Sequence, residues 1–140
     1  MRRGRQMARE YRLKPTVEIA EGVTLDKPGI YEWAITYPDG LIRRYVGKYT
    51  RRSRSMREYR ANVERILDLR PYRKASPKGF RHVHRELAAA ATEGRSIILM
   101  ILENALPEDL NRREQALIRE RGATLNGTGA PTGLSQRFLA

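Results

Sequence analysis

The sequence predicts a small α+β domain in which helices flank a three-stranded antiparallel sheet, in the order ββααβα. Three observations lead to this fold class: two β-rich runs joined by Pro-Asp-Gly, three stretches with helical periodicity, and one isoleucine-rich run between the second and third of them. A chain of 140 residues fits one domain with its own core. We expect that domain at residues 28–127, after a basic arm and lead-in at residues 1–27 and before an irregular tail at residues 128–140.

The first two strands are predicted to form a hairpin. The runs "GIYEWAITY" and "LIRRYVGKY" are rich in β-branched and aromatic residues, and "PDG" stands between them. Asp-Gly between two such runs is a strong hairpin signal, because glycine accepts the positive φ that the turn needs. The hairpin would bring two tyrosine tripeptides side by side, Gly29-Ile30-Tyr31 and Tyr45-Val46-Gly47.

The rest of the chain is predicted to supply three helices and one strand. In the arginine-rich tract after the hairpin, apolar residues recur at helical spacings of three and four: Met56, Tyr59, Val63, Ile66 and Leu67. A second helix begins near Phe80 and ends at Gly94. Residues 96–104, "SIILMILEN", predict a strand that is buried on both faces. Pro107 and Gly122 mark the start and the end of the third helix.

The charge balance favours a polyanionic partner. The chain has 28 Lys and Arg against 16 Asp and Glu, a formal net charge of +12, which attracts nucleic acid by long-range steering and counterion release. An anionic membrane surface would use the same charge, but no run is apolar enough to span a bilayer, and no apolar run follows the basic N-terminus as in a signal peptide. We therefore expect a cytoplasmic protein that binds DNA and no membrane. The first dozen residues are either a solvated tail or an arm that contacts the DNA.

Composition excludes several kinds of catalytic centre. The chain has no cysteine, which excludes a disulfide, a thiolate zinc site and a cysteine nucleophile, and its two histidines, His82 and His84, are too few for a multi-histidine metal centre. Hydrolysis of a phosphodiester needs a proton acceptor for the attacking water and positive charge for the phosphoryl oxygens. The chain offers tyrosines, a lysine, many arginines and a carboxylate in its last helix, and nearby cations favour deprotonation of a phenol.

The two tripeptides and the residues that follow them resemble the GIY-YIG endonuclease family. Lys48 follows the second tripeptide, arginines follow on the next helix, Glu114 lies in the helix after the third strand, and Asn126 comes twelve residues later. The resemblance covers roughly residues 28–127 and implies a nuclease domain with the fold that is already expected from periodicity.

The resemblance implies a metal-dependent endonuclease that hydrolyses DNA phosphodiester bonds. Tyr31 and Tyr45 would be the catalytic tyrosines, one taking a proton from the attacking water and the other positioning the water or the phosphate, and which does which stays open. Lys48 would supply positive charge beside Tyr45. Glu114 would bind one divalent cation, Mg²⁺ or Mn²⁺, and Asn126 would orient or contact the site.

One position departs from the family pattern. The family commonly has an arginine at the position that Ser55 occupies here. Arg57 and Arg54 flank the gap, and we expect Arg57 to be the catalytic arginine. Arginines of the same tract would contact DNA: Arg51, Arg52, Arg54 and Arg60. His84 would bring a histidine near the site if the second helix packs against it.

Two alternatives stay open. The missing arginine at position 55 is consistent with a nucleic-acid-binding module of the same fold that is catalytically weak or inactive. A structure-specific nuclease that acts on branched DNA or on RNA would share the same fold and the same residues, and fold alone does not choose among these functions.

Overall fold

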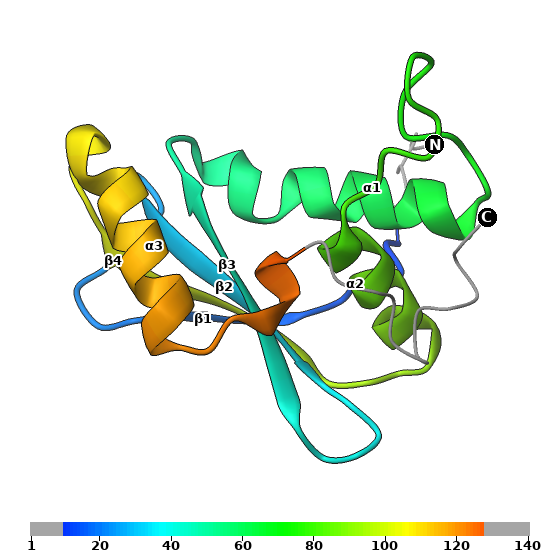
Figure 1. Ribbon diagram of the computed structural model, residues 1–140, viewed down its shortest axis with the longest axis horizontal. Helices are drawn as coiled ribbons and strands as arrows, with labels where there is room; N and C mark the ends of the chain where they lie inside the picture. Colours follow the sequence, from blue (N-terminus) through cyan, green and yellow to red (C-terminus); the bar gives the residue numbers. More distant parts are fainter. Residues whose placement is uncertain (1–9, 128–140) are drawn as a thin grey trace, which may run out of the picture.

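The structure, a computed structural model, describes residues 10–127 apart from the side chain of Ser53 (Figure 1). The predicted tail at residues 128–140 and most of the predicted arm lie outside the described residues. The strands are β1 (Thr16–Ile19), β2 (Gly29–Thr36), β3 (Ile42–Tyr49) and β4 (Ile97–Asn104), and the α-helices are α1 (Arg57–Leu67), α2 (His82–Thr92) and α3 (Leu110–Glu120). Short 3-10 helices lie at Arg52–Ser55 (η1), Pro107–Asp109 (η2) and Thr124–Asn126 (η3). The domain therefore has the α+β architecture that the sequence predicts.

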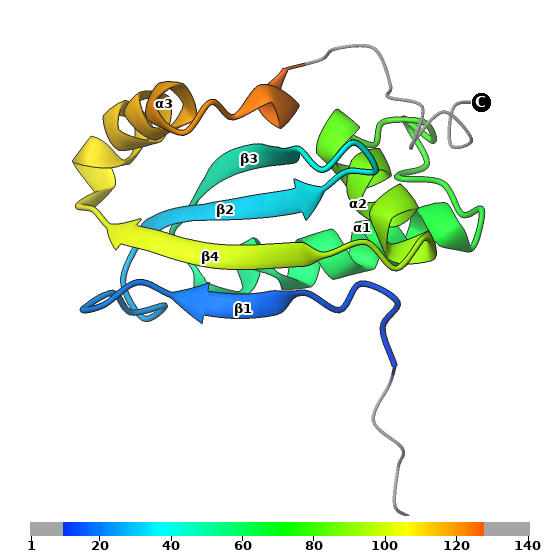
Figure 2. The same ribbon diagram turned by 90° about the horizontal axis from the view of Figure 1, so that it is seen from below.

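The sheet has one strand more than expected and is not purely antiparallel. Its order is β1-β4-β2-β3, with β1 parallel to β4 and the other pairs antiparallel (Figure 2). The extra strand, β1, lies in the segment that was expected to be a lead-in, and all four of its residues are exposed. A four-residue edge strand without a buried face has no alternating burial pattern to mark it in a sequence.

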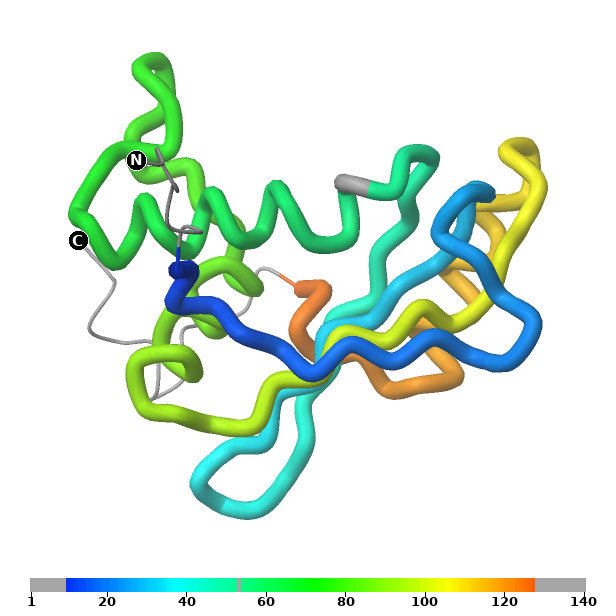
Figure 3. The backbone as a smooth tube through the Cα atoms, turned by 180° about the vertical axis from the view of Figure 1, so that it is seen from behind, coloured from blue at the N-terminus to red at the C-terminus, as the bar shows by residue number. Residues whose placement is uncertain are grey.

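The lead-in is fastened to α1 by hydrogen bonds and ion pairs. Arg12 donates from its backbone N to Glu64 Oε2 at 2.7 Å and from Nη2 to Glu64 Oε1 and to Asp68 Oδ1 at 2.6 Å each. Leu13 is fully buried, and its carbonyl accepts a hydrogen bond from Arg60 Nε at 3.4 Å. Figure 3 follows this blue segment from α1 to its place beside β4. Residues 10–19 therefore belong to the folded domain.

The two faces of the sheet are covered by different helices, because side chains alternate between the faces of a strand. On one face the strands pack against α1 and α2, with a core that includes Tyr31, Trp33, Ile35, Tyr45, Tyr59, Val63 and Leu87. On the other face they pack against α3, through Ile30, Val46, Leu110, Leu117 and Ala123. Along β4, alternate residues are buried and the rest are partly exposed, so the expected burial on both faces holds for one face only.

Candidate active site

Each glycine of the two tripeptides lies opposite a tyrosine of the neighbouring strand. Gly47 pairs with Tyr31 in the β2–β3 register, and Gly29 pairs with Tyr49. A Cβ on Gly47 would collide with the ring of Tyr31, and a Cβ on Gly29 would collide with the Tyr49 hydroxyl and the carbonyl of Glu103. Close approach therefore requires glycine at both positions, and each glycine provides the space in which a tyrosine ring lies.

A cleft opens at β3, the edge strand of the sheet. It has a volume of about 470 Å³ and is lined by residues from four parts of the chain: Tyr31, Tyr45, Lys48, Tyr49, Thr50, Arg51, Arg54, Glu58, Arg81, Leu110 and Glu114. The tyrosines belong to the face that packs on α1 and α2, whereas Leu110 packs on the face covered by α3. Because β3 is an edge strand, residues from both faces reach one cleft, and the structure brings together Tyr31, Tyr45, Lys48 and Glu114.

Two tyrosines of the cleft, Tyr31 and Tyr45, are joined through hydrogen bonds to Tyr59 and Arg81. The Tyr31 and Tyr59 hydroxyls are 2.5 Å apart, and Arg81 donates from Nη1 to the Tyr45 oxygen at 2.5 Å and from Nη2 to the Tyr59 oxygen at 3.2 Å. The rings of Tyr31 and Tyr59 meet edge to face with centroids 5.7 Å apart. One guanidinium thus connects the tyrosine of β3 to the tyrosine of α1.

The two tripeptide tyrosines differ in their surroundings. Tyr31 is 1% exposed and Tyr45 is 9% exposed. Burial raises the pKa of Tyr31 to about 12, with a smaller contribution from Tyr45, and the hydrogen bond to Tyr59 and the charge of Arg81 offset this only in part. Burial also raises the pKa of Tyr59 well above its usual value. Tyr31 and Tyr59 therefore keep their protons at neutral pH.

Arg81 is a residue of the site that the sequence analysis missed. It lies directly before α2, 36 residues from Tyr45 along the chain, and no local pattern marks it. Its backbone N–H donates to Nδ1 of His84 at 3.1 Å, so the buried imidazole holds the residue that presents the guanidinium. Burial lowers the pKa of His84 to about 3, with contributions from the charges of Arg81, Arg85 and Arg54. His84 is neutral and does not belong to the described lining of the cleft.

The segment around Ser55 presents to the cleft an arginine other than the expected Arg57. Ser55 is buried, and its hydroxyl donates to the carbonyl oxygen of Arg52 at 3.3 Å. Arg57 is exposed and is not among the described residues that line the cleft, whereas Arg54 is. The 3-10 helix η1 precedes α1, and the guanidinium groups that line the cleft come from Arg51, Arg54 and Arg81.

Two of the four arginines that were expected to contact DNA reach the cleft. Arg51 and Arg54 line it. Arg52 pairs with Asp26 of the lead-in at 2.8 Å, and Arg60 lies over the ring of Tyr11 at 4.7 Å from its centroid. The latter two side chains are therefore engaged with the N-terminal segment.

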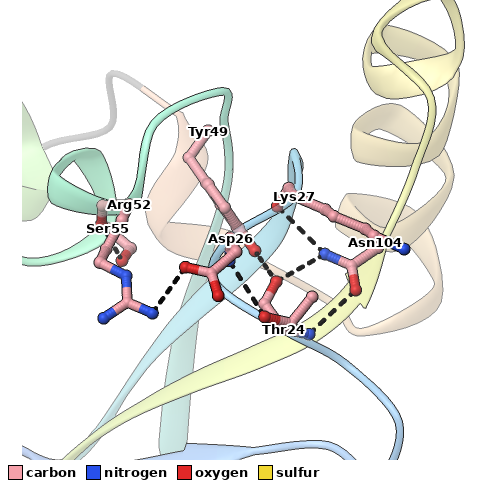
Figure 4. Close-up of polar contacts among 7 residues, drawn as sticks. All are labelled: Thr24, Asp26, Lys27, Tyr49, Arg52, Ser55 and Asn104. Carbon is pink, nitrogen blue, oxygen red and sulfur yellow. Dashed lines mark hydrogen bonds and ion pairs between the residues drawn. The ribbon is translucent and has the colours of Figure 1, made fainter.

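A polar network between the lead-in and the sheet includes Tyr49, which lines the cleft (Figure 4). The Asn104 side chain accepts a hydrogen bond from the Thr24 N–H at 3.0 Å and donates to the Thr24 carbonyl at 2.8 Å. The Tyr49 hydroxyl donates to that same carbonyl at 3.2 Å. Together with the pair between Asp26 and Arg52, these bonds hold the end of β3 and the start of η1, from which Arg51 and Arg54 extend.

Lys48 and Asn126 support the site in different ways. Lys48 Nζ lies 3.7 Å from Glu114 Oε1 and also donates to the side-chain oxygen of Asn111. Asn126 is not among the described residues of the cleft; its amide donates to the Val46 carbonyl at 2.7 Å and accepts from the Val46 N–H at 2.8 Å. Asn126 thus binds the free edge of β3 as another strand would, and it fixes the backbone next to Tyr45.

The residues of the cleft fit a divalent cation that is shared with a substrate. The described residues contain no group of three or more His, Cys, Asp or Glu side chains that would enclose a metal. Two carboxylates, Glu58 and Glu114, are among the described residues that line the cleft. Glu58 pairs with Arg54 at 3.1 Å, whereas the contact of Glu114 with Lys48, at 3.7 Å, is longer than a direct hydrogen bond. Mg²⁺ is commonly held by one or two carboxylates together with waters and substrate phosphates, which is the arrangement that this site allows.

Comparison with known proteins identifies no relative. No family model, curated protein or solved structure matches the chain. Within residues 10–127, no helix has the length and apolar character needed to cross a membrane. The function is therefore inferred from the cleft itself.

Proposed function

We propose that the protein is a metal-dependent endonuclease that hydrolyses DNA phosphodiester bonds, similar to the GIY-YIG endonucleases. One observation carries this proposal: residues from two paired strands, the segment before α2 and helix α3 converge on one cleft, and they are Tyr31, Tyr45, Lys48, Arg81 and Glu114. They include a proton acceptor, cations for a phosphate and a carboxylate for a metal, which are the groups that phosphodiester hydrolysis requires.

Tyr45 is the better candidate for the proton acceptor. Tyr31 is almost fully buried, shares a hydrogen bond with Tyr59 and has a pKa of about 12, so it stays a phenol and acts through its position. Tyr45 is the more exposed of the two, and its oxygen accepts a hydrogen bond from Arg81. In the phenolate form its oxygen would take the proton from the attacking water, and the guanidinium would balance the negative charge that this form carries.

The cations of the cleft would bind the scissile phosphate. Arg51, Arg54 and Lys48 line the same cleft as Tyr45, and charge-assisted hydrogen bonds from such groups stabilise the charge that develops on phosphoryl oxygens. Glu114 would hold Mg²⁺ or Mn²⁺; when bound, the cation supplies Lewis acidity to the phosphate and to the leaving oxygen. Lys48 now contacts this carboxylate and would turn to the phosphate.

The main rival is a nucleic-acid-binding module without strong catalysis, and Ser55 is the observation that favours it. The guanidinium of Arg81 weighs against it, because it brings to Tyr45 the charge that position 55 does not provide. We therefore prefer the enzyme.

A cleavage assay tests the proposal. Supercoiled, linear and branched DNA are incubated with the protein, with and without Mg²⁺, and with the variants Glu114→Gln and Glu120→Gln. Glu120 is an exposed carboxylate of the same helix and serves as the matched control. We expect metal-dependent cleavage that Glu114→Gln lowers by about two orders of magnitude or more, with DNA binding retained. No cleavage of any DNA by the wild type, or cleavage by Glu114→Gln at the wild-type rate, would contradict the proposal.

A further inference from the structure

A second groove adjoins the cleft on the side of α1. It has a volume of about 550 Å³, and three residues line both hollows: Arg54, Glu58 and Arg81. Its remaining walls come from α1 and from the loop at residues 68–81, and they include Asn62, Arg65, Tyr72 and Arg73. A DNA strand that leaves the cleft past Arg54 and Arg81 would enter this groove directly.

The groove is strongly positive. Among the described residues, Arg65, Arg73 and Arg81 form no ion pair, and each of them donates instead to a neutral side-chain oxygen. Arg54 meets Glu58 at 3.1 Å, but this pair is exposed and is therefore weak. Guanidinium groups crowded around one hollow repel one another, and a bound phosphate relieves that repulsion.

The groove also presents an aromatic ring. Tyr72 is partly exposed, and its ring packs against Phe80, at a centroid distance of 5.3 Å, and against His84, at 6.4 Å. The guanidinium of Arg73 lies over the Tyr72 ring at 4.7 Å from its centroid. An aromatic ring next to a guanidinium is the combination on which unpaired nucleobases stack, and a base can take the place of the guanidinium on the ring.

We propose that this groove binds the nucleotide next to the scissile phosphate, with Arg65 and Arg73 on its phosphate and Tyr72 stacked on its unpaired base. This inference rests on the proposed nuclease function and names its substrate class. A base that is paired within a duplex is not available to Tyr72. The preferred substrate is therefore DNA with a single-stranded segment beside the cut, as at a flap or a branch.

The test compares two DNA substrates in a protein that binds without cutting. Fluorescein-labelled flap DNA and fully paired DNA of the same sequence are titrated with Glu114→Gln protein by anisotropy, with Tyr72→Ala, Tyr72→Phe or Arg73→Gln added. Tyr72→Ala should weaken flap binding by roughly tenfold, as loss of one stacked base does, and change duplex binding by less than about twofold. Tyr72→Phe, which keeps the ring, should retain flap affinity. Arg73→Gln should weaken flap binding more than duplex binding.

Arg119→Gln is the matched control, because Arg119 is an exposed arginine of α3, which covers the other face of the sheet. It should not change the preference for flap DNA. The inference is overturned if Tyr72→Ala and Arg73→Gln leave flap binding unchanged, or weaken flap and duplex binding equally. If Tyr72→Ala fails to fold, the exposed Arg73 decides the outcome alone.

The two proposals can fail separately. Metal-dependent cleavage by the wild type, with flap binding that does not depend on Tyr72 or Arg73, overturns the proposed role of the groove and leaves the nuclease proposal intact. If the wild type cuts no DNA but its preference for flap DNA is lost in Tyr72→Ala, the result supports binding of an unpaired base in the groove and overturns the nuclease proposal.

Discussion

Replacement of Arg81 is the most direct test of the proposed chemistry. Its guanidinium contacts the Tyr45 oxygen at 2.5 Å and the Tyr59 oxygen at 3.2 Å, and it lines the cleft where a phosphate would bind. Arg81→Gln removes the charge and keeps a polar side chain. Arg81→Lys keeps the charge, but an ammonium has no planar fork with which to hold two oxygens at once.

The size of the effect follows from these contacts. Each hydrogen bond to a charged group contributes about 1.5–3 kcal/mol, and loss of one preorganised charge-stabilising donor lowers kcat by about 10²–10³-fold in other enzymes. We expect Arg81→Gln to lower kcat by about 10²–10³-fold and Arg81→Lys to lower it by a smaller factor. Binding should change much less, because one phosphate contact among several is lost.

Single-turnover cleavage of labelled DNA in saturating Mg²⁺ separates these quantities. Arg57→Gln is the matched control, because Arg57 is exposed on α1 and lies outside the described lining of the cleft. Its cleavage rate should stay within about threefold of wild type. A similar loss in Arg57→Gln and Arg81→Gln, or a wild-type rate in Arg81→Gln, would refute the role of Arg81 and return the catalytic arginine to α1.

Three further outcomes are expected. Gly47→Ala should lower the free energy of unfolding in urea by roughly 1–3 kcal/mol and impair cleavage, because its Cβ meets the Tyr31 ring; unchanged stability would show that the ring can move aside. The pKa of His84 lies at about 3 in the folded protein, below its usual 6.5, so neutral His84 contributes fully to the free energy of unfolding above pH 6.5. This contribution is lost as the pH falls toward 3, by about 1.4 kcal/mol for each pH unit. His84→Gln should flatten this acid dependence of urea unfolding, and an equally steep dependence in the variant would argue against it. DNA affinity should fall by roughly tenfold or more from about 50 to about 200 mM salt, and a flat response would exclude a broad phosphate-binding surface.

Local sequence patterns predicted the elements that carry their own signal. The hairpin follows from its Asp-Gly turn, and Gly40 has φ +85° there. The hairpin register then places Tyr31 and Tyr45 on one face, beside the cleft that also holds Glu114. The roles of these residues are implied by the resemblance to the GIY-YIG family, and the elements that carry them could be predicted because strand pairing and helix periodicity are local properties of the chain. Strand β1 carries no such signal, since all of its residues are exposed.

The remaining parts of the site depend on contacts between distant segments. Arg81 reaches Tyr45 only because α2 packs beside α1, and nothing in the residues around it predicts that contact. Arg57 and Arg54 flank position 55 in the sequence, and no local pattern predicts that the 3-10 helix η1 lies before α1. The resemblance to the family predicts that Asn126 orients or contacts the site. Its two hydrogen bonds with the Val46 backbone provide a way for it to orient β3.

The matched glycines and tyrosines of β2 and β3 have a consequence for how such a site can vary. Tyr31 fits over Gly47, and Tyr49 fits over Gly29, so the geometry is set by which residues face each other and not by how many residues separate them. The hairpin could gain or lose equal numbers of residues on its two strands beyond Thr36 and Ile42, and the tyrosines would still meet their glycines. A one-residue insertion in a single strand, closer to the cleft, would move Tyr45 to the opposite face. Length is therefore free at the far end of the hairpin and fixed at the end that forms the cleft.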